Sequence, residues 1–473
     1  MTGKHAGGGQ AAPLPIPRAT SQNASTALAV GVFAVVRHRL ARLSVRRLLT
    51  AAVIAVPALA ILGPVAALPH FRSLFALRVV LALIVLVGTP WLIVARRRWR
   101  LEAPTFVALY AAWVAWLVIT LAWAPDRQAG LHYLLLFAEL GAIGVAAASA
   151  GTSRRRLSYL LLGLALVLGL ALLVATAEWT LHVHLPTANP FYAHHRYPAA
   201  FFYNTNDFAT YLVLCWPFVL LLPAWRRTRA TTVLTAVAAL GSVAALLFSG
   251  SRSSLLTFGL ETVIVAVVIA AHGSPRVRRA TVALAVVVVL GAGVLLSGHG
   301  GSTFGKFTLT KIASEVRSGQ GSGGVRFDLQ IAGLRAAATR YFLGVGPGNA
   351  ETVVGRQNLQ FTIVNVHDWW LEVFVDGGLP ALLIFVTIYL MALRSMVRVA
   401  RWARDPLLRY LGLATAVSLI GLTIAMIGPS TAIKFPPMAI LLGLAVAVLI
   451  RARREAQEQG AELAAGGPGS AAA

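Results

Sequence analysis

The chain alternates between long apolar runs and shorter polar connections that are rich in arginine. A membrane-spanning helix needs about 20 mostly apolar residues to cross roughly 30 Å of hydrocarbon, and twelve runs qualify. They are centred on 48–68, 74–95, 105–124, 130–150, 157–180, 207–223, 231–249, 254–272, 280–297, 369–393, 410–429 and 436–450. The pattern predicts an all-α polytopic membrane protein with about twelve transmembrane helices.

The polar segments predict the domain organisation. Residues 1–46 are rich in Gly, Pro, Ser and Arg and lack the layout of a cleaved signal peptide, so we expect a disordered cytoplasmic tail. Helices one to nine occupy 47–297, and an extracytoplasmic loop over 298–368 separates the ninth from the tenth. Helices ten to twelve occupy 369–450, and 451–473 forms a second cytoplasmic tail.

The basic residues predict the orientation. If both termini are cytoplasmic, every inward connection carries at least three Lys or Arg, such as "RRRWR" (96–100), "SRRR" (153–156) and "RARR" (451–454). Short outward loops carry one or two, namely Arg72, Arg127, Arg196, Arg252 and Lys434. This asymmetry follows the positive-inside rule. It predicts a multi-pass protein of the cytoplasmic (inner) membrane with its active face outside.

Composition excludes soluble classes of protein. Of the 473 residues, 58% are hydrophobic and 12% charged, against a charged share of about a quarter in soluble domains. The 41 Lys and Arg outnumber the 16 Asp and Glu, but they stand in short clusters between apolar runs, whereas a nucleic-acid interface gathers them on one surface. We therefore expect no nucleic-acid partner. The single cysteine, Cys215, excludes a disulfide framework.

The long outward connection is unusually basic and contains a predicted helix. Long loops escape the charge rule, so its basic residues need another explanation. The pattern of Val325–Phe342 predicts an amphipathic helix that rests on the membrane or on the bundle, with Arg326 and Arg340 projecting from one edge. The residues of its predicted apolar stripe are Phe327, Ile331, Leu334, Ala338, Tyr341 and Phe342. The alternative is a basic helix that binds lipid headgroups.

Two other outward segments carry candidate chemistry. In "SGSRSS" (249–254), Arg252 stands in a polar turn at membrane level, where an arginine tends to line a cavity or pair with an anion; the alternative is a side chain that snorkels from the end of a span. The segment 181–206 contains four histidines whose spacing matches no zinc pattern. Its aromatic residues, including Phe201 and Phe202, are typical of an interfacial belt.

The stretch "VNVHDWWLE" (364–372) lies at the start of the tenth apolar run. His367 precedes two tryptophans that suit the aromatic belt. Glu372 and Asp376 follow inside the run, where unpaired carboxylates are costly, and their i,i+4 spacing places them on one helical face. The outer surface thus collects several arginines and one histidine, a composition that favours an anionic ligand arriving in the membrane plane.

Four of these segments together resemble a known family. They are "RYPAAFFYNTNDFATYL" (196–212), "SGSRSSLLTF" (249–258), "VRFDLQIAGLRAAATRYFLGVGPGNAE" (325–351) and "HDWWLEVFVDGGLPALLIF" (367–385). In this order they resemble the motifs of the O-antigen ligase superfamily, which includes O-antigen ligases and surface polysaccharide polymerases. Two departures are Asp368, where the family usually has asparagine, and the Gly-Gly-Leu-Pro of 377–380, which replaces a Gly-x-x-Gly.

The resemblance implies a metal-independent glycosyltransferase without a cofactor. Its donor would be an oligosaccharide on a polyprenyl (undecaprenyl) diphosphate, and its acceptor a sugar hydroxyl of a glycan or lipid-linked glycan. By motif, Arg252 and Arg326 match essential arginines and His367 an essential histidine. The planar guanidinium of arginine can bind two phosphate oxygens at once, and His367 could act as the general base. The predicted substrate-binding residues are Arg196, Asn206, Arg335, Arg340 and Glu372.

The sequence leaves other functions open. Ligase and polymerase share these motifs, and the Ala-, Val-, Arg- and Gly-rich composition tilts the choice toward a surface polysaccharide other than lipopolysaccharide. Twelve spans are also common in transporters, so a transporter or flippase of polysaccharide export is the alternative. Its best proton-coupling residues are Glu139, Glu178 and Glu261. A scaffold that recruits assembly proteins is a third class.

Overall fold

The computed structural model describes most of the apolar runs. The described residues are 45–68, 71–94, 103–189, 197–226, 228–272, 279, 314–315, 317–318, 321–357, 365–428 and 433–465. The chain divides into two compact units, Met1–Ala51 and Ala52–Ala473. The first unit contributes residues 45–51 to the described part of the chain, so the account below concerns the second.

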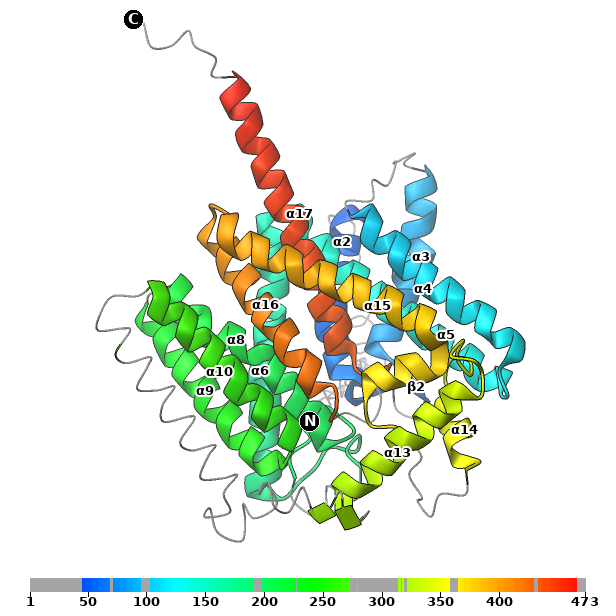
Figure 1. Cartoon of the computed structure of the whole chain (residues 1–473). Helices are drawn as coiled ribbons and strands as arrows, with labels where there is room; N and C mark the ends of the chain where they lie inside the picture. Colours follow the sequence, from blue (N-terminus) through cyan, green and yellow to red (C-terminus); the bar gives the residue numbers. More distant parts are fainter. Residues whose placement is uncertain are drawn as a thin grey trace, which may run out of the picture. The chain divides into compact units, whose positions relative to one another are not determined.

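Helices dominate the described residues (Figure 1). The long helices are α2 (Val45–Leu62), α3 (Ala76–Val94), α4 (Pro104–Thr120), α5 (Arg127–Ser149), α6 (Arg154–Leu181), α8 (Thr205–Trp225), α9 (Arg229–Ser249), α10 (Arg252–His272), α13 (Gly321–Ala338), α15 (Trp369–Trp402), α16 (Pro406–Ala425) and α17 (Pro436–Ala465). The short elements are α14 (Ala350–Gly355), three 3₁₀ turns, η1 (Gly63–Ala66), η2 (Leu121–Trp123) and η3 (Ala150–Thr152), and two strands, β1 (Ala67–Leu68) and β2 (Phe71–Phe75).

Side-chain caps fix where several helices begin. Asp126, Ser153 and Asn204 precede α5, α6 and α8, and each accepts a hydrogen bond from a backbone N–H of the first turn. Asp368 and Asp405 do the same for α15 and α16. A cap of this kind satisfies a backbone donor that has no partner within the helix, so these polar residues set the ends of the apolar helices.

The all-α polytopic membrane architecture is confirmed. Among the described residues, ten helices are long and apolar enough to cross a membrane, and the apolar part of α3, Ala76–Pro90, is shorter. The predicted run 280–297 lies outside the described residues, so the total of twelve stays a prediction. Most of the predicted run 48–68 is a candidate span over Arg47–Ala66, formed by α2 and η1, and the antiparallel pair of β1 with β2 follows it.

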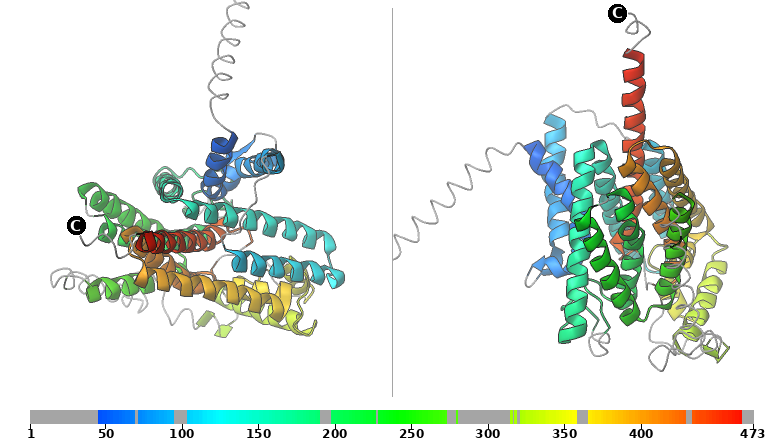
Figure 2. Two further views of the ribbon diagram at one scale, coloured as in Figure 1. Left: turned by 90° about the horizontal axis from the view of Figure 1, so that it is seen from above. Right: turned by 90° about the vertical axis from the view of Figure 1, so that its left-hand side faces the viewer.

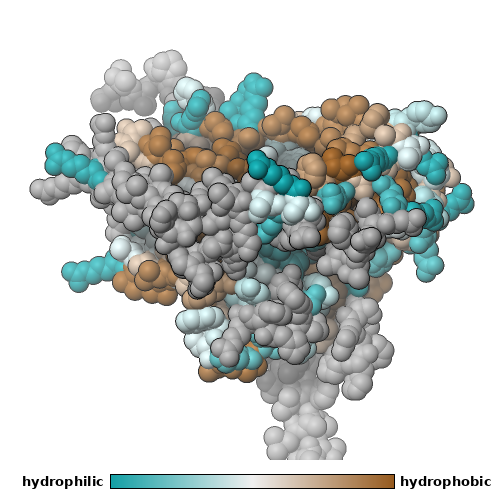
Figure 3. Space-filling view, turned by 60° about the horizontal axis from the view of Figure 1, so that its bottom comes forward, coloured by the Kyte–Doolittle hydropathy of each residue, from teal (hydrophilic) through white to brown (hydrophobic). Residues whose placement is uncertain are grey.

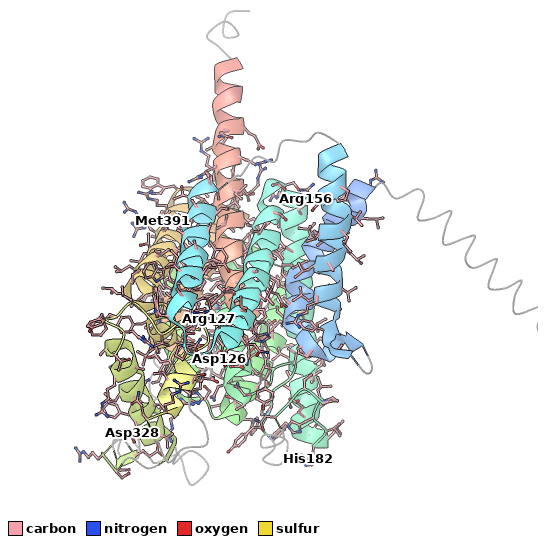
Figure 4. All side chains as sticks on the ribbon, turned by 90° about the vertical axis from the view of Figure 1, so that its right-hand side faces the viewer. Asp126, Arg127, Arg156, His182, Asp328 and Met391 are labelled. Carbon is pink, nitrogen blue, oxygen red and sulfur yellow. The ribbon has the colours of Figure 1, made fainter. Side chains whose placement is uncertain are left out.

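The helices pack around α15, α16 and α17. Helix α16 contacts α8, α10 and α15, while α17 contacts α5, α15 and α16; Figure 2 shows α17 between α5 and the α15–α16 pair. The two ends of this bundle differ in content. In Figure 4, His182 and Asp328 lie toward one end, and Arg156 and Met391 toward the other. The segment before α8, α13 and the start of α15 therefore share one end, called the outer end below.

Helix α15 is broken near the outer end, at Gly378, whose φ of 71° is left-handed. Pro380 has no N–H for the carbonyl of Asp376, and the N–H of Leu379 donates instead to Phe342 O at 2.8 Å. The carbonyls of Val375 and Asp376 accept hydrogen bonds from Val345 and Gly346 at 2.9 Å each. The Gly-Gly-Leu-Pro sequence thus ends a short first segment, 369–377, and joins it to residues 342–346.

Replacing Gly378 by alanine is expected to destabilise the protein. A Cβ there would lie 2.3 Å from Phe342 O, with φ already at 71°, and backbone strain alone costs about 1–3 kcal/mol. We expect a lower thermal unfolding midpoint in detergent. Gly259→Ala is the matched control, because a Cβ at Gly259 meets nothing within 4 Å and alanine favours helix. Equal midpoints for the two variants would contradict the assigned strain.

Candidate functional site

His367 lies immediately before α15 in a constrained turn. Its φ is 48°, a left-handed conformation that is uncommon for residues other than glycine. The turn is held by Asn365, whose Oδ1 accepts the backbone N–H of His367 at 2.8 Å. Asn365 Nδ2 in turn donates to Glu351 Oε1 at 2.8 Å. Glu351 of α14 and Asn365 therefore fix the backbone that presents the imidazole.

The His367 imidazole is held in its neutral form. Burial, together with the nearby Arg326 guanidinium, lowers the pKa of His367 from 6.5 to about 4, because both disfavour the imidazolium. Its Nδ1 is buried and has no hydrogen-bond partner among the described residues. At neutral pH the ring consequently has an unprotonated nitrogen, next to a permanent positive charge.

The residues after His367 are structural. Asp368 caps α15 by accepting the N–H of Leu371 at 3.3 Å, and burial raises the pKa of this carboxyl. Trp369 is 3% exposed and packs edge-on against Phe385 at 4.5 Å between centroids. The assignment of Trp369 to an interfacial belt was wrong, because its ring lies in the core.

Arg326 is brought to His367 by α13, which packs on α14 and on the first segment of α15. Its buried face consists of Leu329, Ala332, Gly333, Ala336 and Ala337. Small residues are required there, since a Cβ at Gly333 would lie 2.9 Å from Val366 Cγ1. Arg326 is half-buried in the first turns of the helix.

The predicted apolar stripe of this helix lies on the protein surface and is not its contact with the bundle. Phe327 and Leu334 are 47% and 45% exposed, and Tyr341 is 87% exposed. Close packing on α15 selects the small residues of α13 and leaves its bulky residues outward. The predicted helix 325–342 is also shifted, because α13 covers Gly321–Ala338 and the chain then turns through left-handed Tyr341 and Phe342.

Arg252 is the first residue of α10, at the turn between α9 and α10. Its guanidinium forms a bidentate ion pair with Glu315, at 2.9 Å and 3.2 Å. Oε2 of Glu315 also accepts the N–H of Gly323 at 3.2 Å. Through this carboxylate, Arg252 is connected to the first turn of α13, one helical turn before Arg326.

The end of α16 joins the turns that carry Arg252 and His367. A Cβ at Gly428 would lie 2.5 Å from Ser253 Oγ, beside Arg252. Two residues earlier, the carbonyl of Met426 accepts the N–H of Trp369 at 3.2 Å. The three residues predicted to be catalytic therefore lie on neighbouring elements at one end of the bundle. Hydrophilic and hydrophobic side chains stand side by side on the surface of this end (Figure 3).

The predicted substrate-binding residues have different positions. Asn206 is half-buried in the first turn of α8, and neighbouring Thr205 donates to Ser249 O at 3.3 Å, which places α8 beside the turn of Arg252. Glu372 is 6% exposed in the first turn of α15. Arg335 and Arg340 are exposed, in the last turn of α13 and just after it. Arg196 lies outside the described residues.

Two carboxylates in apolar runs have structural roles that sequence reasoning missed. Asp376 accepts the N–H groups of Gly348 and Ala350 at 2.8 Å each, so it ties the "GVGPGN" turn to α15. Glu178 accepts those of Ala199 and Ala200 at 2.9 and 2.8 Å. The only sequence signal was a carboxylate within an apolar run, where a compensating partner is required.

Glu178 also holds the segment before α8 against the bundle. Phe201 and Phe202 are buried, and the ring of Phe202 lies 5.3 Å from that of Tyr211. Their assignment to an interfacial belt was wrong, because the chain around them is hydrogen-bonded into the bundle. His184 lies nearby, with Nε2 at 3.2 Å from Tyr197 O.

The carboxylates of the transporter alternative differ in their surroundings. Glu139 pairs with Arg78 at 3.2 Å, and Glu178 is occupied by the backbone, as described above. Glu261 of α10 is fully buried against Gly421 of α16, and neither of its oxygens has a hydrogen-bond partner among the described residues. Two of the three residues thus have structural partners.

Comparison with known proteins points to the segment that contains the three residues predicted to be catalytic. Residues 236–386 match the O-antigen ligase family, and this segment contains Arg252, Arg326 and His367. Over this segment, about a third of the chain, the protein is similar to O-antigen ligases. Over 302 residues it is also 24% identical to the teichuronic acid biosynthesis protein TuaE of Bacillus subtilis (strain 168), covering 62% of this chain and 61% of that protein. The chain therefore spans about three fifths of the length of this relative.

Proposed function

We propose that this protein is an integral-membrane glycosyltransferase that acts as a surface polysaccharide ligase or polymerase. It transfers a glycan from a polyprenyl-diphosphate carrier to a sugar hydroxyl on a second glycan at the outer face of the cytoplasmic membrane. Support comes from the family match over residues 236–386 and from the ten apolar helices among the described residues. The observation that carries the proposal is the His367 imidazole, which lies near Arg326 and whose Nδ1 is buried without a hydrogen-bond partner among the described residues.

In this proposal the two arginines bind the leaving group. The bond between the anomeric carbon and the diphosphate oxygen breaks with its electron pair on that oxygen, so negative charge grows there. Fixed cations aimed at this charge lower the barrier, and arginine can bind phosphate oxygens bidentately. Arg252 and Arg326 come from different elements that meet at the outer end, so they can contact the two phosphates from two sides.

His367 acts as the general base. Its unprotonated nitrogen accepts the proton of the acceptor hydroxyl while the hydroxyl oxygen bonds to the anomeric carbon, with inversion. The lipid diphosphate departs, and the histidine later returns its proton to solvent. The low pKa of His367 keeps it neutral until the hydroxyl arrives. The growing negative charge of the reacting diphosphate then favours the imidazolium.

The other predicted residues surround this reaction. Asn206 and Glu372 lie in first turns of helices at the outer end, where they can bind sugar hydroxyls. Arg335 and Arg340 are assigned to anionic groups of the glycan or of membrane lipids, and Arg196 to the donor. The transfer needs no metal or other cofactor, because the arginines supply the positive charge.

The pH dependence follows from the pKa of His367. The neutral imidazole is the active form, so kcat/KM falls as the pH drops through about 4 and changes little between pH 5 and 7. A histidine with the ordinary pKa would instead give an inflection near 6.5. The test is a pH profile of kcat/KM, with activity re-measured at pH 7 after each low-pH exposure. An inflection near 6.5 would contradict the assigned environment.

Reconstitution tests the proposed reaction. The purified chain is placed in proteoliposomes with a polyprenyl-diphosphate oligosaccharide whose sugar is labelled, and the products are analysed by mass. Longer lipid-linked chains indicate a polymerase, and label on a distinct acceptor indicates a ligase. Movement of intact donor between leaflets without a new glycosidic bond would support the flippase alternative. Activity that EDTA removes and a divalent cation restores would contradict metal independence.

A further inference from the structure

Arg252 is already bound to an anion of the protein itself. Both terminal nitrogens of its guanidinium donate to the carboxylate of Glu315, at 2.9 Å and 3.2 Å. The side chains are 23% and 12% exposed for Arg252 and Glu315 respectively. At that degree of burial, solvent screens the pair only weakly, so the contact is a well-formed ion pair.

The carboxylate and a phosphate would use the same donors. A bidentate arginine presents two parallel N–H groups, and these match the oxygens of a carboxylate and of a phosphate equally well. While Glu315 holds both groups, a diphosphate cannot bind Arg252 in this geometry. Binding of the donor at Arg252 therefore requires the carboxylate to leave.

Glu315 has a second partner that would keep it in place after such an exchange. Its Oε2 also accepts the N–H of Gly323 in the first turn of α13, and the start of a helix favours negative charge. Released from Arg252, the carboxylate keeps this bond. The exchange therefore does not leave a charge without any partner, which makes the ion pair displaceable.

We propose that Glu315 is an internal competitor that a substrate diphosphate must displace from Arg252. This inference rests on the donor site of the proposed function. The competition lowers the affinity of every anion for Arg252 by one common factor. Single phosphates that bind weakly, such as phospholipid headgroups, therefore occupy Arg252 less. A diphosphate that also reaches Arg326 retains enough affinity to bind.

Pyrophosphate binding tests the inference. The full chain in detergent is titrated calorimetrically with inorganic pyrophosphate, and separately with inorganic phosphate. Glu315→Gln keeps the shape of the side chain and an acceptor for Gly323 but removes the competing charge. We expect it to tighten the binding of both anions by about tenfold, within the usual range of coupling between two ligands. The matched control is Asp328→Asn on α13, which removes the same charge from a half-buried residue; we expect less than about a twofold change because of screening.

The outcomes separate this inference from the proposed function. Unchanged or weaker binding in Glu315→Gln, with the fold verified by gel filtration and thermal unfolding, would overturn the competitor role. Glu315→Asp provides a second test, since its shorter side chain loosens the pair and should also tighten binding. Arg252→Gln should weaken pyrophosphate binding and remove any gain from Glu315→Gln. If Arg252→Gln binds pyrophosphate like the unaltered protein, the donor site of the proposed function is wrong.

Discussion

His367→Ala is expected to lower glycan transfer by about 10²- to 10⁴-fold, the usual contribution of a general base. The remaining rate would come from the arginines, which position the donor and stabilise its leaving group. The change is expected in kcat more than in donor binding, because the imidazole meets the acceptor hydroxyl. The measurement is the initial rate of glycan transfer in proteoliposomes, together with pyrophosphate affinity.

His182→Ala is the matched control for this prediction. His182 is an exposed histidine that lies toward the same end of the bundle, at the end of α6 (Figure 4). Its replacement should leave the rate unchanged. A His367→Ala variant that inserts, unfolds at the normal temperature and transfers glycan at the normal rate would remove His367 from the mechanism.

Loss of either arginine is expected to reduce transfer by about 10²- to 10³-fold, as removal of one group that stabilises developing charge does in other enzymes. For Arg326 the variant is Arg326→Ala. For Arg252 the variant is Arg252→Lys, which keeps a positive charge opposite the Glu315 carboxylate. Lysine retains a point charge but cannot form the bidentate contact, so it should recover only part of the rate.

Arg127→Ala controls for the loss of an exposed arginine. Arg127 begins α5, and its side chain donates to Ala122 O at 3.2 Å without touching the predicted site residues named above. It should keep near-normal transfer. Normal transfer by Arg326→Ala or Arg252→Lys would instead show that the donor diphosphate is bound elsewhere, and a matching loss in Arg127→Ala would point to a general effect of surface charge.

Much of the fold follows from the sequence, because few backbone structures are stable in the hydrocarbon core of a membrane. Backbone groups in lipid must bond within their own segment, so each long apolar run predicts a helix. The kind of helix was less predictable. Within the run 48–68, α2 ends at Leu62 and the 3₁₀ turn η1 continues to Ala66. Apolar composition alone does not distinguish these two kinds of helix.

The packing of α13 shows a second limit. The predicted stripe with Phe327 and Leu334 lies on the surface, and a second face with Ala332, Gly333 and Ala336 packs on the protein. The sequence pattern did not indicate this second face. The distance between α13 and α15 decides which residues fit, and this distance is a property of the assembled bundle. The burial of Trp369 was likewise not predictable from the sequence. Its ring packs against Phe385, which lies beyond the break in α15.

The charged residues of the candidate site were predictable from the sequence, but the residues that hold them in place were not. Arg252, Arg326 and His367 stand out because strong cations and a histidine gather at predicted outer segments. Glu315 and Glu351 gave no such signal, since each is a single acidic residue in a polar segment. Their roles depend on Arg252, 63 residues away from Glu315, and on Asn365, 14 residues away from Glu351. A single sequence does not reveal such pairings.

The break at Gly378 leaves a short first segment of α15 at the outer end. Residues 369–377 are bonded to the chain around Val345 and carry His367 at their start, and α13, with Arg326, packs on the same segment. Arg252 belongs to α10 and the membrane-embedded bundle. The N–H of Trp369 also donates to Met426 O of α16, and Arg252 is linked to α13 through Glu315. The base and both cations are therefore held by one connected set of contacts, so a donor that displaces Glu315 would meet groups already in place.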